Sequence, residues 1–161
     1  MKKPAGICGM ILLVILLAGC GTSSAPRAEK SSPAAKAEPG VGQPVEAGDV
    51  TVTVHTWAAS QGDDFSTPAE GSQYIVVDLE VDNAGTAGYP FSTMVMLSIV
   101  TPAGYEYSQA MYFPEPKFPN GDIPGSGKAR GNVAFEVPVN IGTMSLQFSP
   151  VTGDSVRIKL Q

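Results

Sequence analysis

The sequence predicts an all-β fold, an antiparallel β-sandwich of about seven strands, and three observations lead to this class. Short runs rich in β-branched and aromatic residues recur from residue 46 onward. Turns rich in Gly, Pro, Asn and Asp separate these runs, and the chain contains 18 Gly and 14 Pro among its 161 residues. No stretch keeps the apolar period that a long amphipathic helix needs.

The predicted strands follow one another at short intervals. Residues 49–57, 72–82 and 129–137 alternate apolar and polar side chains, which is typical of strands with one buried face. Residues 93–100 are almost entirely apolar, which favours a strand that is buried on both faces. Shorter strands are expected at residues 104–107, 143–148 and 155–160.

The first twenty residues predict a secretion signal that ends in a lipidation site. Two lysines precede an apolar run, residues 7–17, which is shorter than the roughly 18–20 residues that span a bilayer. The run ends in Leu17, Ala18, Gly19 and Cys20. These four residues resemble the bacterial lipobox, which implies that the Cys20 thiol receives a diacylglyceryl group and that residues 1–19 are removed. The alternative is an ordinary secretory signal that is cleaved elsewhere.

Residues 20–45 predict a disordered, lipid-anchored linker. They are mostly Gly, Ala, Ser and Pro without an aromatic residue, so they bury too little apolar surface to offset the entropy of ordering. We therefore expect the folded domain to occupy residues 46–161. Because Cys8 lies in the signal, the lipidated Cys20 would be the one cysteine of the mature chain, which excludes disulfides and thiol catalysis.

Charge and composition exclude several classes of function. The net charge of −5 argues against nucleic-acid binding, because phosphate contacts need a basic surface. Two Cys and one His are too few for most zinc sites made of protein ligands. The single histidine, His55, falls on the same face of its predicted strand as Trp57, and alone it provides little acid–base chemistry near neutral pH. We therefore expect no enzyme activity, and hydrolysis is the weakest function considered.

Acidic side chains gather in the early strands. Asp78, Glu80 and Asp82 lie on one face of their predicted strand, and residues 37–116 contain no Lys or Arg. If early and late strands form different sheets, one face of the domain is strongly acidic. If they alternate within a sheet, the acids pair with later basic residues across strands. Those basic residues are Lys128, Arg130, Arg157 and Lys159. The sequence leaves both arrangements open.

Two patterns are compatible with metal binding, and each has a structural alternative. Asp63 and Asp64, or the acidic strand, suit Ca²⁺, but adjacent aspartates are common in turns and a straight strand presents carboxylates poorly. A Cu(I) site would combine His55 with thioethers, whereas methionines in an apolar strand usually pack in the core. The candidate thioethers are Met94, Met96 and Met111. We favour the structural interpretation in each case and expect no cofactor.

Residues 104–119, here called the aromatic loop, are the candidate partner-binding segment. The loop contains three prolines and many of the chain's aromatic residues. Its candidate contact residues are Tyr105, Tyr107, Met111, Tyr112, Phe113 and Phe118. A long aromatic loop stiffened by proline at the end of a sandwich is well suited to binding a partner. The alternative is a flap that covers one open end of the core.

Three segments carry a resemblance to a known family. They are residues 71–85 (GSQYIVVDLEVDNAG), 123–125 (IPG) and 131–138 (GNVAFEVP). They resemble the immunoglobulin-like lipoprotein domain of unknown function that is common in Gram-positive bacteria, which is similar in structure to a secreted immunogenic antigen family of mycobacteria. The resemblance covers residues 46–161 and implies an immunoglobulin-like sandwich. It supplies no catalytic residues.

Together, these patterns predict a lipid-anchored binding module on the extracytoplasmic side of the cell membrane. The diacylglyceryl group on Cys20 would hold it to the membrane, and the aromatic loop would bind an envelope protein or a cell-wall partner. The alternative is a carrier of copper, calcium or a small ligand in the cell envelope.

Overall fold

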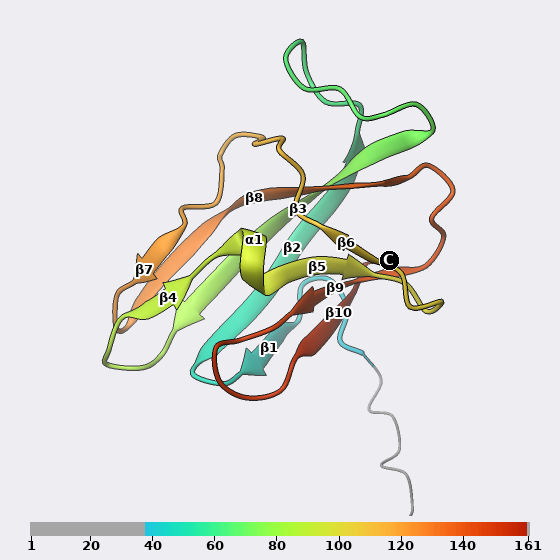
Figure 1. Ribbon diagram of the computed structural model, residues 1–161. Helices are drawn as coiled ribbons and strands as arrows, with labels where there is room; N and C mark the ends of the chain where they lie inside the picture. Colours follow the sequence, from blue (N-terminus) through green and yellow to red (C-terminus); the bar gives the residue numbers. More distant parts are fainter. Residues whose placement is uncertain (1–37, 161) are drawn as a thin grey trace, which may run out of the picture. The chain divides into compact units, whose positions relative to one another are not determined.

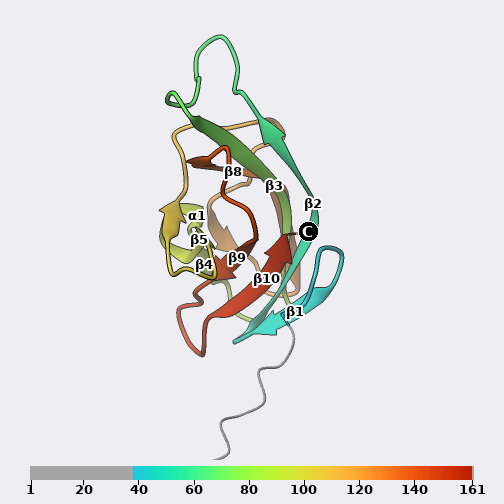
Figure 2. The same cartoon turned by 90° about the vertical axis from the view of Figure 1, so that its right-hand side faces the viewer.

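The computed structural model describes residues 38–160. In this part of the chain, two four-stranded antiparallel sheets lie face to face, with a two-stranded sheet beside them (Figures 1 and 2). This arrangement confirms the predicted all-β sandwich. The predicted signal, the Leu17–Cys20 motif and residues 21–37 lie outside the described residues.

The sheets combine strands from early and late parts of the chain. The first sheet has the order β1-β2-β3-β8 and comprises β1 (Pro44–Ala47), β2 (Val50–Ser60), β3 (Ser72–Asn83) and β8 (Gly127–Pro138). The second has the order β10-β9-β5-β6 and comprises β5 (Leu97–Val100), β6 (Glu106–Ser108), β9 (Met144–Phe148) and β10 (Val156–Leu160). The small sheet pairs β4 (Tyr89–Phe91) with β7 (Gly121–Ile123). The described residues thus form ten strands, more than the seven predicted, because β1, β4 and β7, of four, three and three residues, were not predicted.

The predicted strand at residues 93–100 is wrong in its first half. Residues Thr93–Met96 form a helical turn, α1, and β5 begins only at Leu97. The carbonyl of Ser92 accepts hydrogen bonds from the N–H groups of the third and fourth residues after it, at 3.2 and 2.9 Å. Asn120 Oδ1 accepts two more, from the backbone N–H and the Oγ1 of Thr93, at 2.7 and 3.0 Å. Asn120 lies 27 residues further along the chain, so no local pattern predicts this turn.

The core lies between the two large sheets, where the alternating strands place their apolar faces. Ile75, Val77, Leu79 and Val81 of β3 are all buried, as the alternation predicts. Phe91 of the small sheet packs on two other aromatic rings in the core. The centroid of its ring lies 5.0 Å from that of Phe118 and 5.7 Å from that of Phe148. Each large apolar side chain that is fully buried stabilises the fold by about 1.5–3 kcal/mol.

A β-bulge in β2 changes which side chains face the core. The pairing with β3 shifts between Val54 and Thr56, so His55 is an extra residue without an opposite partner. Val54, before the bulge, is buried in the core, and Trp57, three residues later, also packs against the core. Strict alternation would have placed these two side chains on opposite faces. The predicted common face of His55 and Trp57 is therefore wrong, because one inserted residue reverses the alternation that follows.

Residues 38–42, which the sequence assigns to the linker, pair with strands of the domain. The backbone N–H of Lys159 donates to the carbonyl of Pro39 at 2.7 Å, and Gly40 forms a parallel bridge with Lys159. The N–H of Gly42 donates to the carbonyl of Val54 at 2.7 Å. The chain therefore passes along the edge of β10 before it enters β1, and composition does not reveal such backbone pairing.

Candidate functional site

Part of the aromatic loop lies along the outer edge of β8. The N–H of Ala110 donates to the carbonyl of Ala134 at 2.8 Å, and that of Phe118 donates to Asn132 at 3.1 Å. In return, the N–H of Asn132 donates to the carbonyl of Pro116 at 2.7 Å. Since an unpaired edge strand can join a strand of another molecule, the loop protects this edge of the first sheet.

Gly131 allows the loop to approach β8 closely. A Cβ atom at this position would lie 2.5 Å from the backbone N and Cα of Phe118. That separation is far below a normal contact, so any larger residue would push the loop away from the strand. The glycine of the GNVAFEVP segment is thus explained by a backbone that passes directly over it.

The six candidate residues of the aromatic loop fall into two groups. Tyr107 and Phe118 pack against or within the core, and Tyr112 stacks on Tyr74 with ring centroids 4.7 Å apart. The exposed group comprises Tyr105, Met111 and Phe113, with relative exposures of 66%, 73% and 50%. The loop therefore has the buried anchors expected of a flap and the exposed side chains expected of a binding surface.

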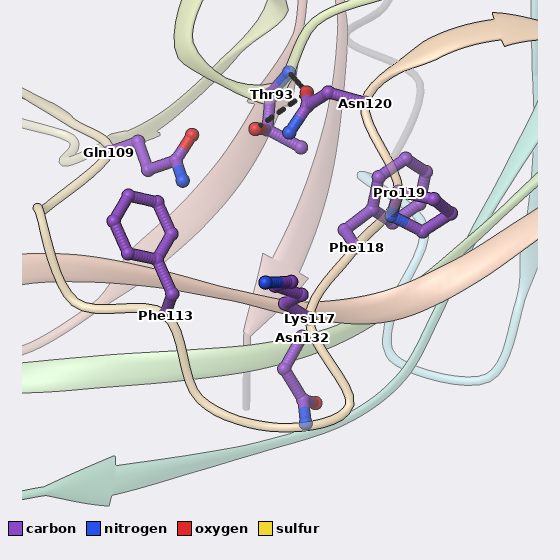
Figure 3. Close-up of a pocket in the computed structure, with 8 residues that line it drawn as sticks. All are labelled: Thr93, Gln109, Phe113, Lys117, Phe118, Pro119, Asn120 and Asn132. Atoms are coloured by element: carbon purple, nitrogen blue, oxygen red, sulfur yellow. Dashed lines mark hydrogen bonds between the residues drawn. The ribbon is translucent and has the colours of Figure 1, made fainter.

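A cavity of about 450 Å³ lies next to the loop and α1; we call it the loop pocket (Figure 3). It is lined by Thr93, Gln109, Phe113, Lys117, Phe118, Pro119, Asn120 and Asn132. In Figure 3, Gln109 and Phe113 lie on one side of the pocket, and Pro119 and Asn120 lie on the other. The pocket thus combines a half-exposed aromatic ring with several amide groups.

Gln109, which lines the loop pocket, has a polar side-chain atom without a hydrogen-bond partner among the described residues. This atom is Oε1, which is buried. A buried acceptor without a partner costs about 1–3 kcal/mol. The side-chain oxygen of Asn120, in contrast, already accepts the two hydrogen bonds from Thr93. The sequence does not predict a role for Gln109, because nothing around it indicates an amide whose oxygen is left without a partner.

The acidic side chains of β3 pair with basic side chains of β8, which lies beside it. Arg130 donates to both carboxylate oxygens of Asp78, at 3.0 and 2.7 Å. The ammonium group of Lys128 lies 3.3 Å from Glu80 and 2.8 Å from Asp82. Early and late strands therefore alternate here, whereas the basic residues of β10 belong to the other sheet.

These ion pairs shift the acidity of the carboxylates. The hydrogen bonds from Arg130 lower the pKa of Asp78, and burial opposes part of this effect. The hydrogen bond with His55 lowers the pKa of Glu80, and Lys128 adds to the shift. Both carboxylates therefore remain charged to a lower pH than they would in an unfolded chain.

The candidate metal ligands do not gather in the described residues. His55 Nε2 lies 3.1 Å from the carboxylate of Glu80, while Met96 belongs to the core. Asp63 Oδ1 accepts the backbone N–H groups of Phe65 and Ser66 at 2.9 and 2.8 Å, an ordinary turn contact. Within residues 38–160, no group of three His, Cys, Asp or Glu side chains is arranged to hold a metal ion. In the same range, no helix is long and apolar enough to cross a membrane.

Comparison with known proteins identifies a family without a known activity. The family described as "Domain of unknown function (DUF4352)" matches residues 39–157. No curated protein matches the sequence. The match covers almost the whole folded domain and agrees with the resemblance seen in the sequence.

Several solved structures are similar in fold. One is ycdA from Bacillus subtilis, a lipoprotein candidate, with a TM-score of 0.61 and 17% identity over 73% of this chain and 38% of that one. Another is an uncharacterized β-sandwich protein from Clostridium difficile, with a TM-score of 0.52 and 13% identity over 81% of this chain and 100% of that one. A third is the secreted protein MPT63 from Mycobacterium tuberculosis, with a TM-score of 0.49 and 14% identity over 78% and 99% of the two chains. This chain thus spans 38% of the length of ycdA, and at identities this low the ycdA and Clostridium difficile structures show the fold alone.

Proposed function

The chain belongs to the DUF4352 family, and on this premise we propose that it is a lipid-anchored, extracytoplasmic binding module without catalytic activity. The Leu17–Cys20 motif and the likeness to a lipoprotein candidate support anchoring through a diacylglyceryl group on Cys20. The domain then stands on the extracytoplasmic side of the cell membrane. Its partner is an envelope protein or a cell-wall component that reaches the loop pocket.

The observation that carries the binding proposal is the buried Gln109 oxygen, without a partner, in the same pocket as Phe113. A ligand group that donates an N–H or O–H satisfies Gln109, while an apolar group packs on the half-exposed ring of Phe113. Lys117 lines the same pocket and favours a ligand with a negative group nearby. Tyr107, Tyr112 and Phe118 hold the loop in place, so that Tyr105, Met111 and Phe113 are presented to the partner.

The binding proposal is tested by capture from gently solubilised envelopes with two pocket variants and one control. Phe113→Ser and Gln109→Met should each lose a partner that the wild-type protein captures, since one removes the ring and the other the acceptor oxygen. Gln109→Met should not lower the melting temperature, because the oxygen it removes makes no hydrogen bond in the described domain. Phe65→Ser is the control, because Phe65 is 97% exposed on another loop. A partner retained by both pocket variants would refute this site.

The anchoring proposal is tested by Cys20→Ser. Without the thiol, no diacylglyceryl group can be attached, so the protein should leave the membrane fraction almost completely. Mass spectrometry of the wild-type protein should detect the acyl chains on Cys20. Membrane association that persists in the variant, together with a wild-type mass that lacks acyl chains, would contradict the proposal.

A further inference from the structure

A second cavity lies on the outer face of the second sheet. It has a volume of about 440 Å³, and we call it the β10 groove. It is lined by Glu38, Val100, Thr101, Pro102, Thr143, Ser145, Arg157 and Lys159. None of these residues lines the loop pocket. Leu146, Ile158 and Leu160 of the same strands point into the core, so Ser145, Arg157 and Lys159 face outward.

The groove already contains a carboxylate from a distant part of the chain. The hydroxyl of Ser145 donates to the carboxylate of Glu38 at 2.6 Å, across 107 residues of sequence. Such a short distance is typical of a hydrogen bond to a charged acceptor. Ser145 itself is only 7% exposed, so its hydroxyl group is a buried donor at the base of the groove. The site is therefore built to receive a carboxylate.

The backbone that carries Glu38 pairs with the edge of β10 through an isolated bridge. Pro39 accepts the N–H of Lys159, and Gly40 pairs with Lys159 in the parallel direction. This register places Glu38 level with Arg157, two residues earlier on β10. Addition of an extended segment to a sheet edge is a common way to bind a peptide, in which the backbone gives affinity and the side chains give specificity.

The groove has positive charge that its present occupant does not neutralise. Among residues 38–160, the basic partners in ion pairs are His55, Lys128 and Arg130, all on the first sheet. Arg157 donates to the side-chain oxygen of Gln147 at 3.0 Å, and Lys159 forms no ion pair with a described carboxylate. Two cationic side chains beside a buried hydroxyl donor favour an acidic ligand.

We propose that the β10 groove and the adjoining edge of β10 bind an extended acidic peptide segment, and that residues 38–40 are the built-in occupant that such a segment displaces. The acidic side chain of the ligand takes the place of Glu38 at Ser145, beside Arg157 and Lys159. Its backbone takes the place of Pro39 and Gly40 along β10. This site is separate from the loop pocket, so the inference stands independently of the proposed function.

The proposal is tested with a synthetic peptide that copies the occupant. The probe is acetyl-Ala-Glu-Pro-Gly-Val-amide, the sequence of residues 37–41, and the control peptide has Gln in place of Glu. The protein is the full chain, purified from membranes in detergent, as wild type, as Glu38→Ala, and as the double variant Glu38→Ala with Ser145→Ala. Binding is measured as a dissociation constant by isothermal titration, and backbone amide shifts of residues 156–160 in NMR spectra report its place.

Removal of the internal competitor should make the site available. We expect Glu38→Ala to bind the acidic peptide about tenfold or more tightly than wild type, and about tenfold or more tightly than the Gln peptide. The double variant should lose this preference for Glu over Gln, and Phe113→Ser should leave it unchanged. The absence of saturable binding to Glu38→Ala at millimolar peptide, equal affinities of this variant for the two peptides, or equal affinity of wild type and Glu38→Ala for the acidic peptide would overturn the proposal. If the peptide experiment fails in this way, the proposed function would still stand provided that the wild-type protein captures a partner and Phe113→Ser does not.

Discussion

The outer faces of the two large sheets carry their charge in different ways. On the first sheet, the acids of β3 face Lys128 and Arg130 on β8, and Arg130 holds Asp78 with two hydrogen bonds. On the second sheet, Arg157 and Lys159 face a groove where the one lining carboxylate, Glu38, comes from the segment before β1. The charges of the first face are thus paired within the sheet, whereas the basic side chains of the second face are available to a separate segment. Paired charges mark a structural surface here, and unpaired ones beside a buried hydroxyl mark a recognition surface.

The largest loss of stability should come from a substitution in the core, which supports the outer faces of both large sheets. Leu79 is fully buried in β3 between the two acids Asp78 and Glu80. Leu79→Ala should lower the free energy of unfolding by about 2–5 kcal/mol, because it leaves a cavity in a packed core. Chemical denaturation measures this change. A loss below about 1 kcal/mol would mean that the core can collapse around this position.

Substitutions on the two outer faces should have smaller and different effects on stability. Asp78→Asn breaks a paired charge on the first face and should lower the free energy of unfolding by less than about 1 kcal/mol, since solvent screens an ion pair with an exposed partner. Arg157→Gln on the second face should leave the melting temperature almost unchanged and should weaken binding of the acidic peptide. Thermal unfolding and peptide titration of both variants test the contrast. If Arg157→Gln proved the more destabilising change, the second face would also be a structural surface.

The smallest effect should appear in how the free energy of unfolding changes with pH under acidic conditions. The pKa values of Asp78 and Glu80 are lowered in the folded chain, so their contribution is present above their unfolded pKa values, at about pH 4. It is lost as the pH falls through the lower folded values. The double variant Asp78→Asn with Glu80→Gln should therefore lose less stability than wild type between about pH 5 and pH 3. Identical pH profiles for the two proteins would show that these pairs do not contribute to stability.

The sequence predicts most of the fold, because the fold depends on the alternation of apolar and polar residues along strands and on the residues that form turns. Ile75, Val77, Leu79 and Val81 are buried as a set because a strand with period two must place them on one face. Tertiary contacts decide the features that were missed. Asn120 holds the turn at Thr93, and the extra residue His55 reverses the alternation before Trp57.

The candidate sites were only partly predictable for a related reason. Aromatic content identifies the aromatic loop, but it does not distinguish the buried Phe118 from the half-exposed Phe113, since both occur in the same segment. Gln109 and Glu38 are single polar residues in ordinary surroundings. Their surroundings in the fold make them notable: the Oε1 of Gln109 is buried without a hydrogen-bond partner, and Glu38 accepts a hydrogen bond from the buried Ser145.

The close passage of the aromatic loop over Gly131 also matters for how copies of this protein meet. With the proposed anchor on Cys20, copies of the protein would share one membrane surface and meet in a limited set of orientations, so a free strand edge on one copy could pair with that of the next. The loop on β8 and residues 38–40 on β10 occupy two such edges within each copy. A side chain at position 131 that pushed the loop from β8 would therefore do more than disturb one pocket, because it would expose the edge of β8 to pairing with a neighbouring copy.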